Sequence, residues 1–257
     1  LLSYIEEYIK AHPKAFAYRE GLSVKNNAYL HKENPYLLKM DFKDFFPSIV
    51  PDLFFNVLKN KEIEFSKEDL LVLKNVFFMK RNKEKKDAFV LSIGAPSSPS
   101  ISNAVMFEFD RTIDEFCNSK SITYSRYADD IVFSTKKRGA LFEVPNIVEN
   151  ALEKHYSSMI MVNKKKTIFS SKAHNRHITG VTITNEGHLS IGKKKRRLLS
   201  AKVHRHSLNL LFDEDIKKLS GELSYAFFIE PSFRDFLIKK YGNNIVLDLM
   251  KYNFKDS

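Results

Sequence analysis

The sequence YSRYADDIVFS, residues 124–134, places two acidic side chains next to each other inside an apolar and aromatic stretch. Side chains that follow one another on a strand point to opposite faces, so Asp129 and Asp130 cannot both be hidden in one strand. Asp is also common in tight turns. The pattern therefore predicts a β-hairpin, with strands over residues 122–127 and 130–135 and the two aspartates at its tip.

A third carboxylate has a similar setting. Asp41 ends an apolar run, PYLLKMDFKDFF at residues 35–46, that predicts a mostly buried strand. If this strand lies beside the hairpin, three carboxylates share one site, and Mg²⁺ prefers oxygen ligands. Two divalent ions about 3.5–4 Å apart activate an attacking oxygen and stabilise a leaving one. The three aspartates thus indicate phosphoryl or nucleotidyl transfer, whereas Asp129 and Asp130 alone would also fit a plain solvent-exposed turn.

The composition is that of a globular protein with a basic surface. The 257 residues are 43% hydrophobic, and 42 Lys and Arg against 31 Asp and Glu give a formal charge of +11. Such a chain is expected to bind a polyanion. Nucleic acid is favoured over a membrane, because no apolar run approaches the roughly 20 residues of a spanning helix. The single cysteine, Cys117, excludes an intrachain disulfide and indicates a reducing compartment.

Helical periodicity accounts for much of the remaining chain. The patterns predict helices over residues 1–11, 50–60, 66–80, 95–117 and 145–156, and helices throughout 193–257. An apolar strand is predicted after the basic stretch 81–89. Further strands are predicted over residues 159–171, 177–184 and 188–192, the last two flanking the turn Asn185-Glu186-Gly187.

Three segments together resemble the reverse transcriptase family. MDFKDFFPSI at residues 40–49, GAPSSPSISN at 94–103 and YSRYADDIVFS occur in the order of that family's palm, and the match covers nearly the whole chain. The resemblance implies an α/β (α+β) right-hand polymerase with partial fingers, a palm whose antiparallel sheet carries the YADD hairpin, and a helical thumb. The implied domains are residues 1–35 for partial fingers, 36–192 for the palm with finger elements around 60–95, and 193–257 for the thumb.

The resemblance also implies residue roles at the catalytic site. Asp41, Asp129 and Asp130 match the catalytic residues that bind two Mg²⁺ ions, and the incoming triphosphate shares that coordination. A primer 3′-hydroxyl attacks, and pyrophosphate leaves. Phe46 matches the aromatic side chain that excludes a ribose 2′-hydroxyl, with core packing as the alternative. Backbone groups from Lys43 to Phe45 would lie beside the sugar and the triphosphate of the nucleotide.

Two further segments match regions that contact nucleotide or template in this family. Gly94 permits close backbone approach, and Ser97 and Ser98 supply hydroxyls at a helix entry. Ile93 stands where most reverse transcriptases have a Gln that contacts the nucleotide. Lys166, in NKKKT at residues 163–167, matches a lysine that would neutralise charge on the leaving phosphate, with a solvated basic turn as the alternative.

The segment GKKKRRLLSAKVHRH, residues 192–206, concentrates cations on a predicted helix. A solvated face is the usual explanation of such a run, but its position after the palm favours a thumb helix that contacts phosphates. In that arrangement Leu198, Leu199 and Val203 pack inward. The residues that face the duplex are Lys194, Arg197 and Arg205. HLSIG, at residues 188–192, resembles the primer-grip turn.

Two more stretches resemble bacterial retron reverse transcriptases. NNAYLH, residues 26–31, contains Asn27-Ala28-x-x-His31, and HITGVTI, residues 177–183, contains Thr179-Gly180 with Ile178 where retrons have Val. The resemblance implies a retron-specific region within residues 1–35, in which Asn27 and His31 contribute to nucleic-acid binding. A hydrogen-bonded structural histidine is the alternative for His31.

By this resemblance, the enzyme binds its own structured noncoding RNA and uses dNTPs to copy part of it into branched, multicopy single-stranded DNA, primed from a guanosine 2′-hydroxyl. The RNA–DNA product stays bound, and the complex restrains an effector protein in anti-phage defence. The location implied is the bacterial cytoplasm, with no membrane partner.

Two alternatives remain open at the level of sequence. One is another bacterial reverse transcriptase, of the group II intron type or a different defence class. The other is a catalytically silent RNA-binding scaffold, which the exchange at Ile93 suggests and the three intact aspartates oppose. The family usually has basic finger strands before the region matched by LLSYIEEYIK, so we expect this sequence to belong to a longer protein.

Overall fold

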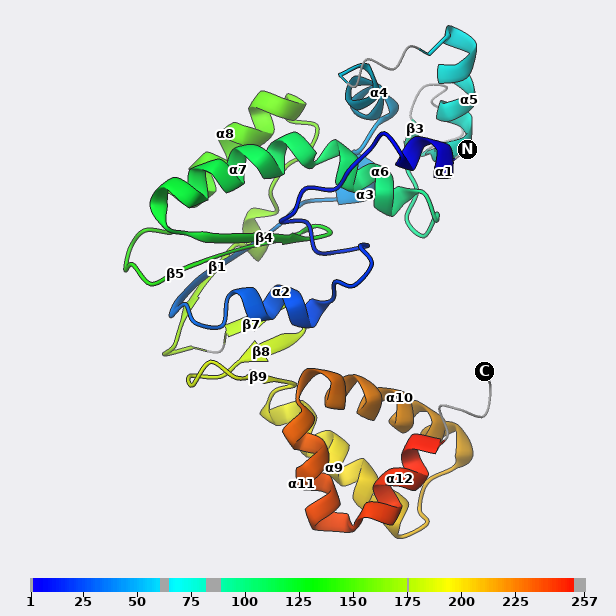
Figure 1. Cartoon of the computed structure of the whole chain (residues 1–257), viewed down its shortest axis with the longest axis vertical. Coiled ribbons are helices and arrows are strands. Elements are labelled where there is room, and N and C mark those ends of the chain that lie inside the picture. Colours follow the sequence, from blue (N-terminus) through cyan, green and yellow to red (C-terminus); the bar gives the residue numbers. More distant parts are fainter. Residues whose placement is uncertain (1, 61–64, 82–88, 175, 252–257) are drawn as a thin grey trace. The chain divides into compact units, whose positions relative to one another are not determined.

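The computed structural model describes residues 2–60, 65–81, 89–174 and 176–251. The chain divides into two compact units, residues 1–174 and residues 175–257. The first unit contains a four-stranded sheet with helices around it, and the second contains a three-stranded sheet and a group of helices (Figure 1).

The first unit is built on an antiparallel sheet with the strand order β4-β5-β1-β6. Its strands are β1 (Tyr36–Asp41), β4 (Thr123–Tyr127), β5 (Asp130–Thr135) and β6 (Ile168–Ser171). The strand predicted before Asp41 and the predicted hairpin are therefore confirmed. The strand predicted over 159–171 is only partly correct. Lys164–Lys166 form a 3₁₀ turn, η1, because the Lys166 N–H donates to the Asn163 carbonyl (2.9 Å).

The register gives the two faces of this sheet different characters, because side chains alternate between faces. One face is apolar and packs on α7 (Phe107–Lys120) and α8 (Val144–Tyr156); it carries the cross-strand pairs Leu38–Phe133 and Met40–Ile131. The opposite face is more polar and carries the pairs Leu37–Ser134, Lys39–Val132 and Asp41–Asp130. Helix α2 (Val24–Leu30) lies over this second face (Figure 1).

The other helices of the first unit are α1 (Leu2–Glu6), α3 (Phe45–Ser48), α4 (Pro51–Lys59), α5 (Lys67–Phe77) and α6 (Ser98–Val105). Two short antiparallel strands, β2 (Phe78–Lys80) and β3 (Phe89–Leu91), accompany them. Helix α5 begins with a capping box, in which the Asp69 N–H donates to Ser66 Oγ (3.1 Å) and the Ser66 N–H donates to Asp69 Oδ2 (3.0 Å). This start agrees with the sequence prediction.

Three helix predictions need correction. The helix predicted over residues 66–80 ends at Phe77, because Phe78–Lys80 pair with Phe89–Leu91 as strand β2. The helix predicted over residues 1–11 ends at Glu6, because the Tyr8 and Ile9 N–H groups both donate to the Ile5 carbonyl and turn the chain. The single helix predicted over 95–117 is two helices, α6 and α7, separated at the buried Met106. The break lets the apolar residues of both helices face one core.

The core of the first unit extends from the apolar sheet face through α7 and α8 to α4 and α6. Cys117 lies in this core, fully buried, and burial raises the pKa of its thiol to about 12. This cysteine is therefore a packing residue. No helix among the described residues is both long enough and apolar enough to span a membrane.

The second unit starts with a small sheet and continues with helices. Its strands are β7 (Arg176–Ile178), β8 (Val181–Ile183) and β9 (Leu189–Ser190), and its helices are α9 (Lys193–Ser207), α10 (Asp213–Ile229), α11 (Pro231–Tyr241) and α12 (Asn243–Lys251). The buried Glu230 joins the two parts, because its Oε2 accepts from Ser190 Oγ (2.7 Å) and the Ile191 N–H (3.1 Å), while Arg196 donates to its other oxygen. The predicted helical character of residues 193–251 is confirmed.

Candidate active site

The three aspartates lie together at one end of the central sheet. Asp41 is the last residue of β1 and Asp130 is the first residue of β5, and the register pairs them directly. Residues opposed in this way have Cβ atoms about 4.5–5.5 Å apart. Asp129 precedes Asp130 in the hairpin turn, and its carbonyl accepts from the Phe42 N–H (3.1 Å). The fold thus brings together acidic residues that are far apart in the sequence.

The hairpin turn that carries Asp129 is tight and strained. Only Ala128 and Asp129 separate the paired ends Tyr127 and Asp130. Ala128 has a φ of 57°, in the left-handed region that primed hairpin turns require and that residues with a Cβ rarely adopt. Arg126 stabilises this conformation, because its Nη1 donates to the Ala128 carbonyl (3.1 Å). The conformation of the hairpin tip is therefore stabilised by a hydrogen bond from the buried Arg126 side chain.

Arg126 is itself held by a buried carboxylate. Its Nε donates to both carboxylate oxygens of Asp110 (2.8 and 3.1 Å) and its Nη2 donates to Asp110 Oδ2 (2.7 Å), and both side chains are fully buried. Tyr124 donates its hydroxyl to the same carboxylate (2.6 Å). Burial lowers the pKa of Arg126, but Asp110 more than offsets this and the pKa is raised. This pair was not predicted from the sequence. The signal for it is that Asp110 and Arg126 are charged residues within apolar patterns.

Burial and mutual repulsion raise the pKa values of Asp129 and Asp130. Burial is the largest cause for both carboxyls, and the charge of Asp41 adds to it. Lys39, on the same sheet face, acts in the opposite direction on Asp130. Lys166 Nζ lies 3.0 Å from Asp41 Oδ2, and this hydrogen bond raises the pKa of the lysine. The aspartates therefore form a site that favours positive charge.

The donor set fits a divalent cation. Carboxylate oxygens are ligands of the kind that Mg²⁺ prefers. Asp41 Oδ1 is buried and has no hydrogen-bond partner among the described residues, so it is available as a ligand. The described residues nevertheless contain no group of three or more His, Cys, Asp or Glu side chains already gathered into a metal site. As folded, two carboxylates oppose each other with a third beside them, and Lys166 supplies the nearest positive charge.

The aromatic residues after Asp41 divide between the core and its edge. Phe42 is buried and stacks on Phe45 with ring centroids 5.5 Å apart. Phe45 is buried too, and its carbonyl accepts from Ser48 Oγ (2.6 Å), so the residue belongs to the core. Phe46 is half-buried at the edge of this core, between Phe45 and Tyr18, with centroid distances of 5.4 and 6.4 Å.

The segment around Gly94 is exposed only in part. Gly94 has a φ of 89° and open space where a Cβ would lie, so its backbone is accessible. The Ile93 side chain is 74% exposed. Ser97 and Ser98 are buried, and Ser98 Oγ donates to the Ser92 carbonyl (2.6 Å). This corrects the expectation that the Ser98 hydroxyl contacts nucleic acid, because the hydroxyl is engaged inside the protein.

Asn27 and His31 are also inside the protein rather than on its surface. Both are fully buried. His31 Nδ1 lies 2.7 Å from Ser134 Oγ on β5, and its Nε2 lies 2.7 Å from Ser125 Oγ on β4. The expected direct contact with nucleic acid is corrected accordingly. His31 joins α2 to the two strands whose turn carries Asp129.

The buried imidazole of His31 predicts a pH dependence of stability. Burial, together with the charge of Lys14, lowers the pKa of His31 from 6.5 to about 3. The unfolded chain therefore binds a proton at a higher pH than the folded chain, and stability falls as the pH falls below about 6.5. We expect a loss of about 1.4 kcal/mol of unfolding free energy per pH unit between pH 6 and pH 5 from this residue.

Urea unfolding at pH 7, 6 and 5 measures this effect. The His31→Gln variant is the control, since it keeps a polar side chain of similar size but lacks a group that titrates in this range. The wild type should lose stability more steeply than the variant. Parallel curves would show that His31 is not kept neutral by the fold.

The cations expected on the thumb helix are exposed. Lys194, Arg197 and Arg205 all point away from the core of the second unit. Leu199 and Val203 are buried as predicted, whereas Leu198 is 54% exposed and does not pack inward. A helical position one residue before Leu199 lies about 100° around the helix from it, which places Leu198 off the buried face.

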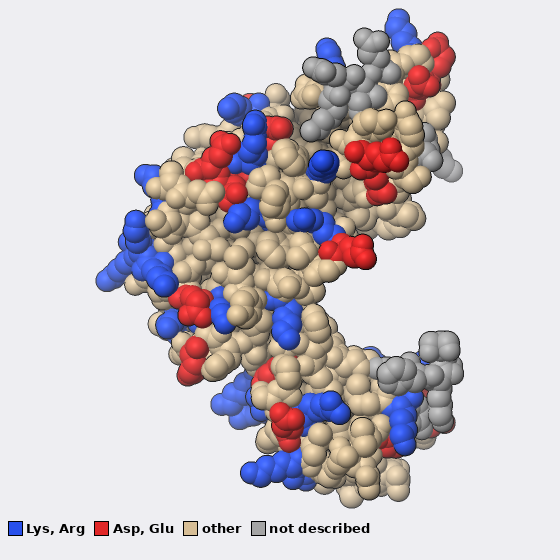
Figure 2. Space-filling view, in the orientation of Figure 1, with Lys and Arg blue, Asp and Glu red and all other residues tan. Residues whose placement is uncertain are grey.

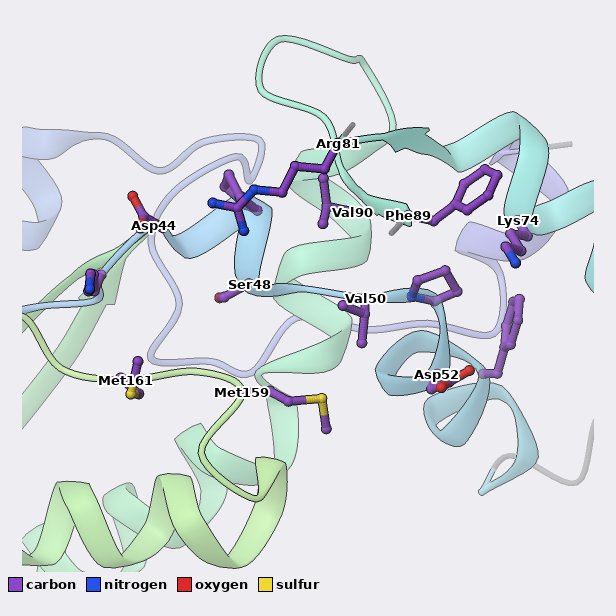
Figure 3. A pocket seen from close by; sticks show the side chains of 14 residues that line it. Asp44, Ser48, Val50, Asp52, Lys74, Arg81, Phe89, Val90, Met159 and Met161 are labelled. Carbon is purple, nitrogen blue, oxygen red and sulfur yellow. The ribbon is translucent and has the colours of Figure 1, made fainter. Parts of the chain in front are cut away.

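A cavity of about 840 Å³ opens beside the segment that follows Asp41 (Figure 3). Its lining combines cations with apolar side chains, among them Lys43, Lys74, Arg81, Val50, Phe89 and Met161. Lys74 and Arg81 come from α5 and from the end of β2. Sequence analysis did not single out these two cations, because no local pattern links them to the aspartates.

Comparison with known proteins gives a consistent result. The profile of the family described as "Reverse transcriptase (RNA-dependent DNA polymerase)" matches residues 2–183. The chain is 40% identical to "Retron Ec83 reverse transcriptase" of Escherichia coli over 253 residues, which cover 98% of this chain and 81% of that protein. It is 30% identical to "Retron Ec73 reverse transcriptase" of Escherichia coli over 256 residues, which cover 95% and 79%.

Solved structures with a similar chain course are more distant. Telomerase from Candida albicans, in complex with a fragment of telomeric RNA, is 12% identical with a TM-score of 0.49, covering 98% of this chain and 46% of that chain. The foamy viral protease-reverse transcriptase, in complex with an RNA/DNA hybrid, is 14% identical with a TM-score of 0.46, covering 86% and 28%. This chain spans less than half the length of either protein.

Proposed function

The chain belongs to the reverse transcriptase family, as an RNA-directed DNA polymerase of the retron type with a mixed helix and sheet fold, and from this premise we propose that it makes RNA-linked DNA from its own structured noncoding RNA. The observation that carries the proposal is the direct pairing of Asp41 with Asp130 at the strand ends, with Asp129 in the adjoining turn. This arrangement supports the proposal that the three carboxylates act together at one site.

We propose that Asp41, Asp129 and Asp130 hold two Mg²⁺ ions. Bound there, the ions would activate the attacking hydroxyl and stabilise charge on the leaving pyrophosphate. Asp41 Oδ1, which has no hydrogen-bond partner in the described chain, is the clearest free ligand atom. The raised pKa values of Asp129 and Asp130 show that their negative charges are unfavourable without a nearby cation. The strained turn at Ala128 keeps the two residues at the end of the sheet.

Lys166 has a role beside these carboxylates in the proposal. Its Nζ donates to Asp41 Oδ2 at 3.0 Å, yet its side chain is 60% exposed, so it can reach a bound ligand without unfolding any segment. A lysine there stabilises negative charge that develops on the leaving phosphate. The 3₁₀ turn Lys164–Lys166 positions the Lys166 side chain beside Asp41, because the chain just before this turn pairs with the backbone at and after Asp41.

Nucleotide and nucleic acid would contact the exposed parts of the expected site. Phe46 is the proposed gate against a ribose 2′-hydroxyl, and the accessible backbone of Gly94 is proposed to contact a nucleotide. The exposed cations of α9 are proposed to bind phosphates: Lys194, Arg197 and Arg205. In this assignment residues 1–35 are partial fingers and a retron-specific region, 36–192 are the palm, and 193–257 are the thumb.

The wider function follows from the retron relatives. We propose that the RNA–DNA product stays bound to the enzyme in the bacterial cytoplasm and that the complex restrains an effector protein in defence against phage. The support for this proposal is the 40% identity to a retron reverse transcriptase over 98% of the chain. A silent RNA-binding scaffold is the second candidate, because the exposed Ile93 replaces the family's nucleotide-contacting Gln.

Expression of the full-length protein with the noncoding RNA encoded beside it tests the proposal. We expect DNA covalently linked to RNA, visible as a product that shortens after RNase treatment, and none from the Asp129→Asn, Asp130→Asn variant. DNA from neither protein would favour the scaffold. DNA that forms only with an added free 3′-end would indicate another class of reverse transcriptase.

A further inference from the structure

The central sheet has a second concave feature, at the end opposite to the aspartates. A cavity of about 230 Å³ lies between the start of β1, the β5–α8 loop and β6. Its lining is mainly apolar and includes Leu37, Leu141, Phe142, Phe169 and His174. Pockets for drug-sized ligands are usually larger, about 300–1,000 Å³. This slot, the name used below for the cavity with these lining residues, therefore has room for one small planar group.

Two aromatic rings form the mouth of the slot. Phe142 is 72% exposed and Phe169 is 45% exposed, and their ring centroids are 5.4 Å apart. Both are anchored by the backbone. The Phe142 N–H donates to the Gly139 carbonyl (3.2 Å), and Phe169 is paired with Leu38 in the sheet. Exposed aromatic side chains on a rigid backbone do not stabilise the fold much, and they are suited to stacking with a ligand.

Exposed cations lie next to lining residues of the slot in the sequence. Lys136, Lys137 and Arg138 are exposed and come immediately before Gly139, which also lines the slot, and the exposed Lys172 follows the lining residue Ser171. None of these four cations forms an ion pair with a described residue. Figure 2 shows blue side chains gathered over the β5–α8 loop, which lies at the left of Figure 1. Uncompensated cations next to exposed aromatic rings are the combination by which proteins bind single-stranded nucleic acid.

We propose that the slot binds one unpaired base of a single-stranded nucleic acid, stacked on Phe142 and Phe169, while Lys136, Lys137 and Arg138 bind the adjoining phosphates. The proposal rests on the proposed function, because it assigns a surface to the RNA partner. β5 runs from Asp130 to Thr135, so the slot lies roughly 17 Å from the aspartates. It therefore holds a part of the nucleic acid that is not being copied.

Binding of a fluorescent 20-nucleotide oligouridine RNA, followed by anisotropy, tests the stacking. Phe142→Ala should weaken binding roughly tenfold, the effect of removing one base-stacking ring. Its ring is mostly exposed, so the variant should unfold like the wild type. Leu71→Ala is the matched control, since Leu71 is an apolar residue of α5 that is 59% exposed and lies outside the slot. We expect the control to bind like the wild type.

The salt dependence of binding tests the phosphate contacts. Removing two contacts to a single strand should make the slope of log affinity against log salt less steep by roughly 1.4. The variant is Lys136→Gln, Lys137→Gln. The control is Lys59→Gln, Lys67→Gln, which changes the charge by the same amount on α4 and α5. An equal change in both variants would show a general charge effect and would overturn the phosphate assignment.

Ultraviolet cross-linking of the bound RNA, followed by peptide mass analysis, locates the base. A cross-link at Phe142 or Phe169 is expected. Unchanged RNA affinity of Phe142→Ala would overturn the proposal. If this variant instead changed the self-association of the protein and not its RNA affinity, the slot would be a protein-docking surface. The Asp129→Asn, Asp130→Asn variant should bind the oligomer like the wild type, so absence of DNA synthesis does not affect this test.

Discussion

Asp130→Asn is expected to reduce DNA synthesis at least about a thousandfold, because the substitution keeps the shape of the side chain but removes a charge that holds a catalytic cation. Extension of a labelled primer by one nucleotide on an RNA template, at saturating Mg²⁺, measures this rate. Asp235→Asn is the matched control. Asp235 is an exposed residue of α11 in the second unit, and its variant should retain the activity of the wild type.

The same substitution should not destabilise the protein when divalent ions are absent. Burial and the charges of Asp129 and Asp41 raise the folded-state pKa of Asp130 above its unfolded value. The stability that goes with this shift is present at low pH and is lost as the pH rises through the folded pKa. Asn removes this penalty at pH 7, so the free energy of unfolding should equal or exceed that of the wild type. A variant that lost both activity and stability would contradict a catalytic role.

Asp110→Ala is expected to cost about 3–5 kcal/mol of unfolding free energy, because it leaves the fully buried charge of Arg126 without its partner. Tyr124 would lose its hydrogen-bond acceptor as well. Urea unfolding at pH 7 measures the loss. Glu108→Ala, in the same helix, removes a surface partner of Arg111 and should cost no more than about 1 kcal/mol.

A second substitution separates the orphaned charge from the loss of packing. Arg126→Met in the Asp110→Ala background removes the guanidinium that has no partner, and replacing a buried ion pair by apolar residues is often close to neutral. We expect the double variant to be more stable than Asp110→Ala alone. If adding Arg126→Met lowers the stability further, the hydrogen bonds from Arg126 to the Ala128 carbonyl and to Asn103 Oδ1 contribute more than the orphaned charge costs.

The parts of the fold that the sequence predicted well are those where a local pattern and burial agree. Residues 124–134 predict a hairpin because two adjacent aspartates, which are common in turns, interrupt an apolar and aromatic stretch. Both strands of the hairpin are almost completely buried. The capping box at Ser66 and Asp69 likewise depends only on neighbouring residues. Local hydrogen bonding decided these elements, and tertiary contacts did not oppose it.

The errors arose where contacts between distant residues decide the structure. Three consecutive lysines, Lys164–Lys166, carry no signal for a 3₁₀ turn, and their conformation follows from pairing of the preceding residues with the chain around Asp41. The burial of His31 could not be read from NNAYLH, because its partners Ser125 and Ser134 lie about a hundred residues away. The slot at Phe142 and Phe169 could not be predicted either, because its lining comes from a loop and an edge strand that are separate in the sequence.

The pairing of Asp41 with Asp130 on the polar face of the sheet also limits which length changes the gene can tolerate. Inserting or deleting a single codon within β1 would turn Asp41 toward the apolar face that packs on α7 and α8, since side chains alternate. A change of two codons restores the face but shifts the carboxylate along the strand, away from its partner. We therefore expect frame-preserving insertions and deletions in this strand to be lost under selection.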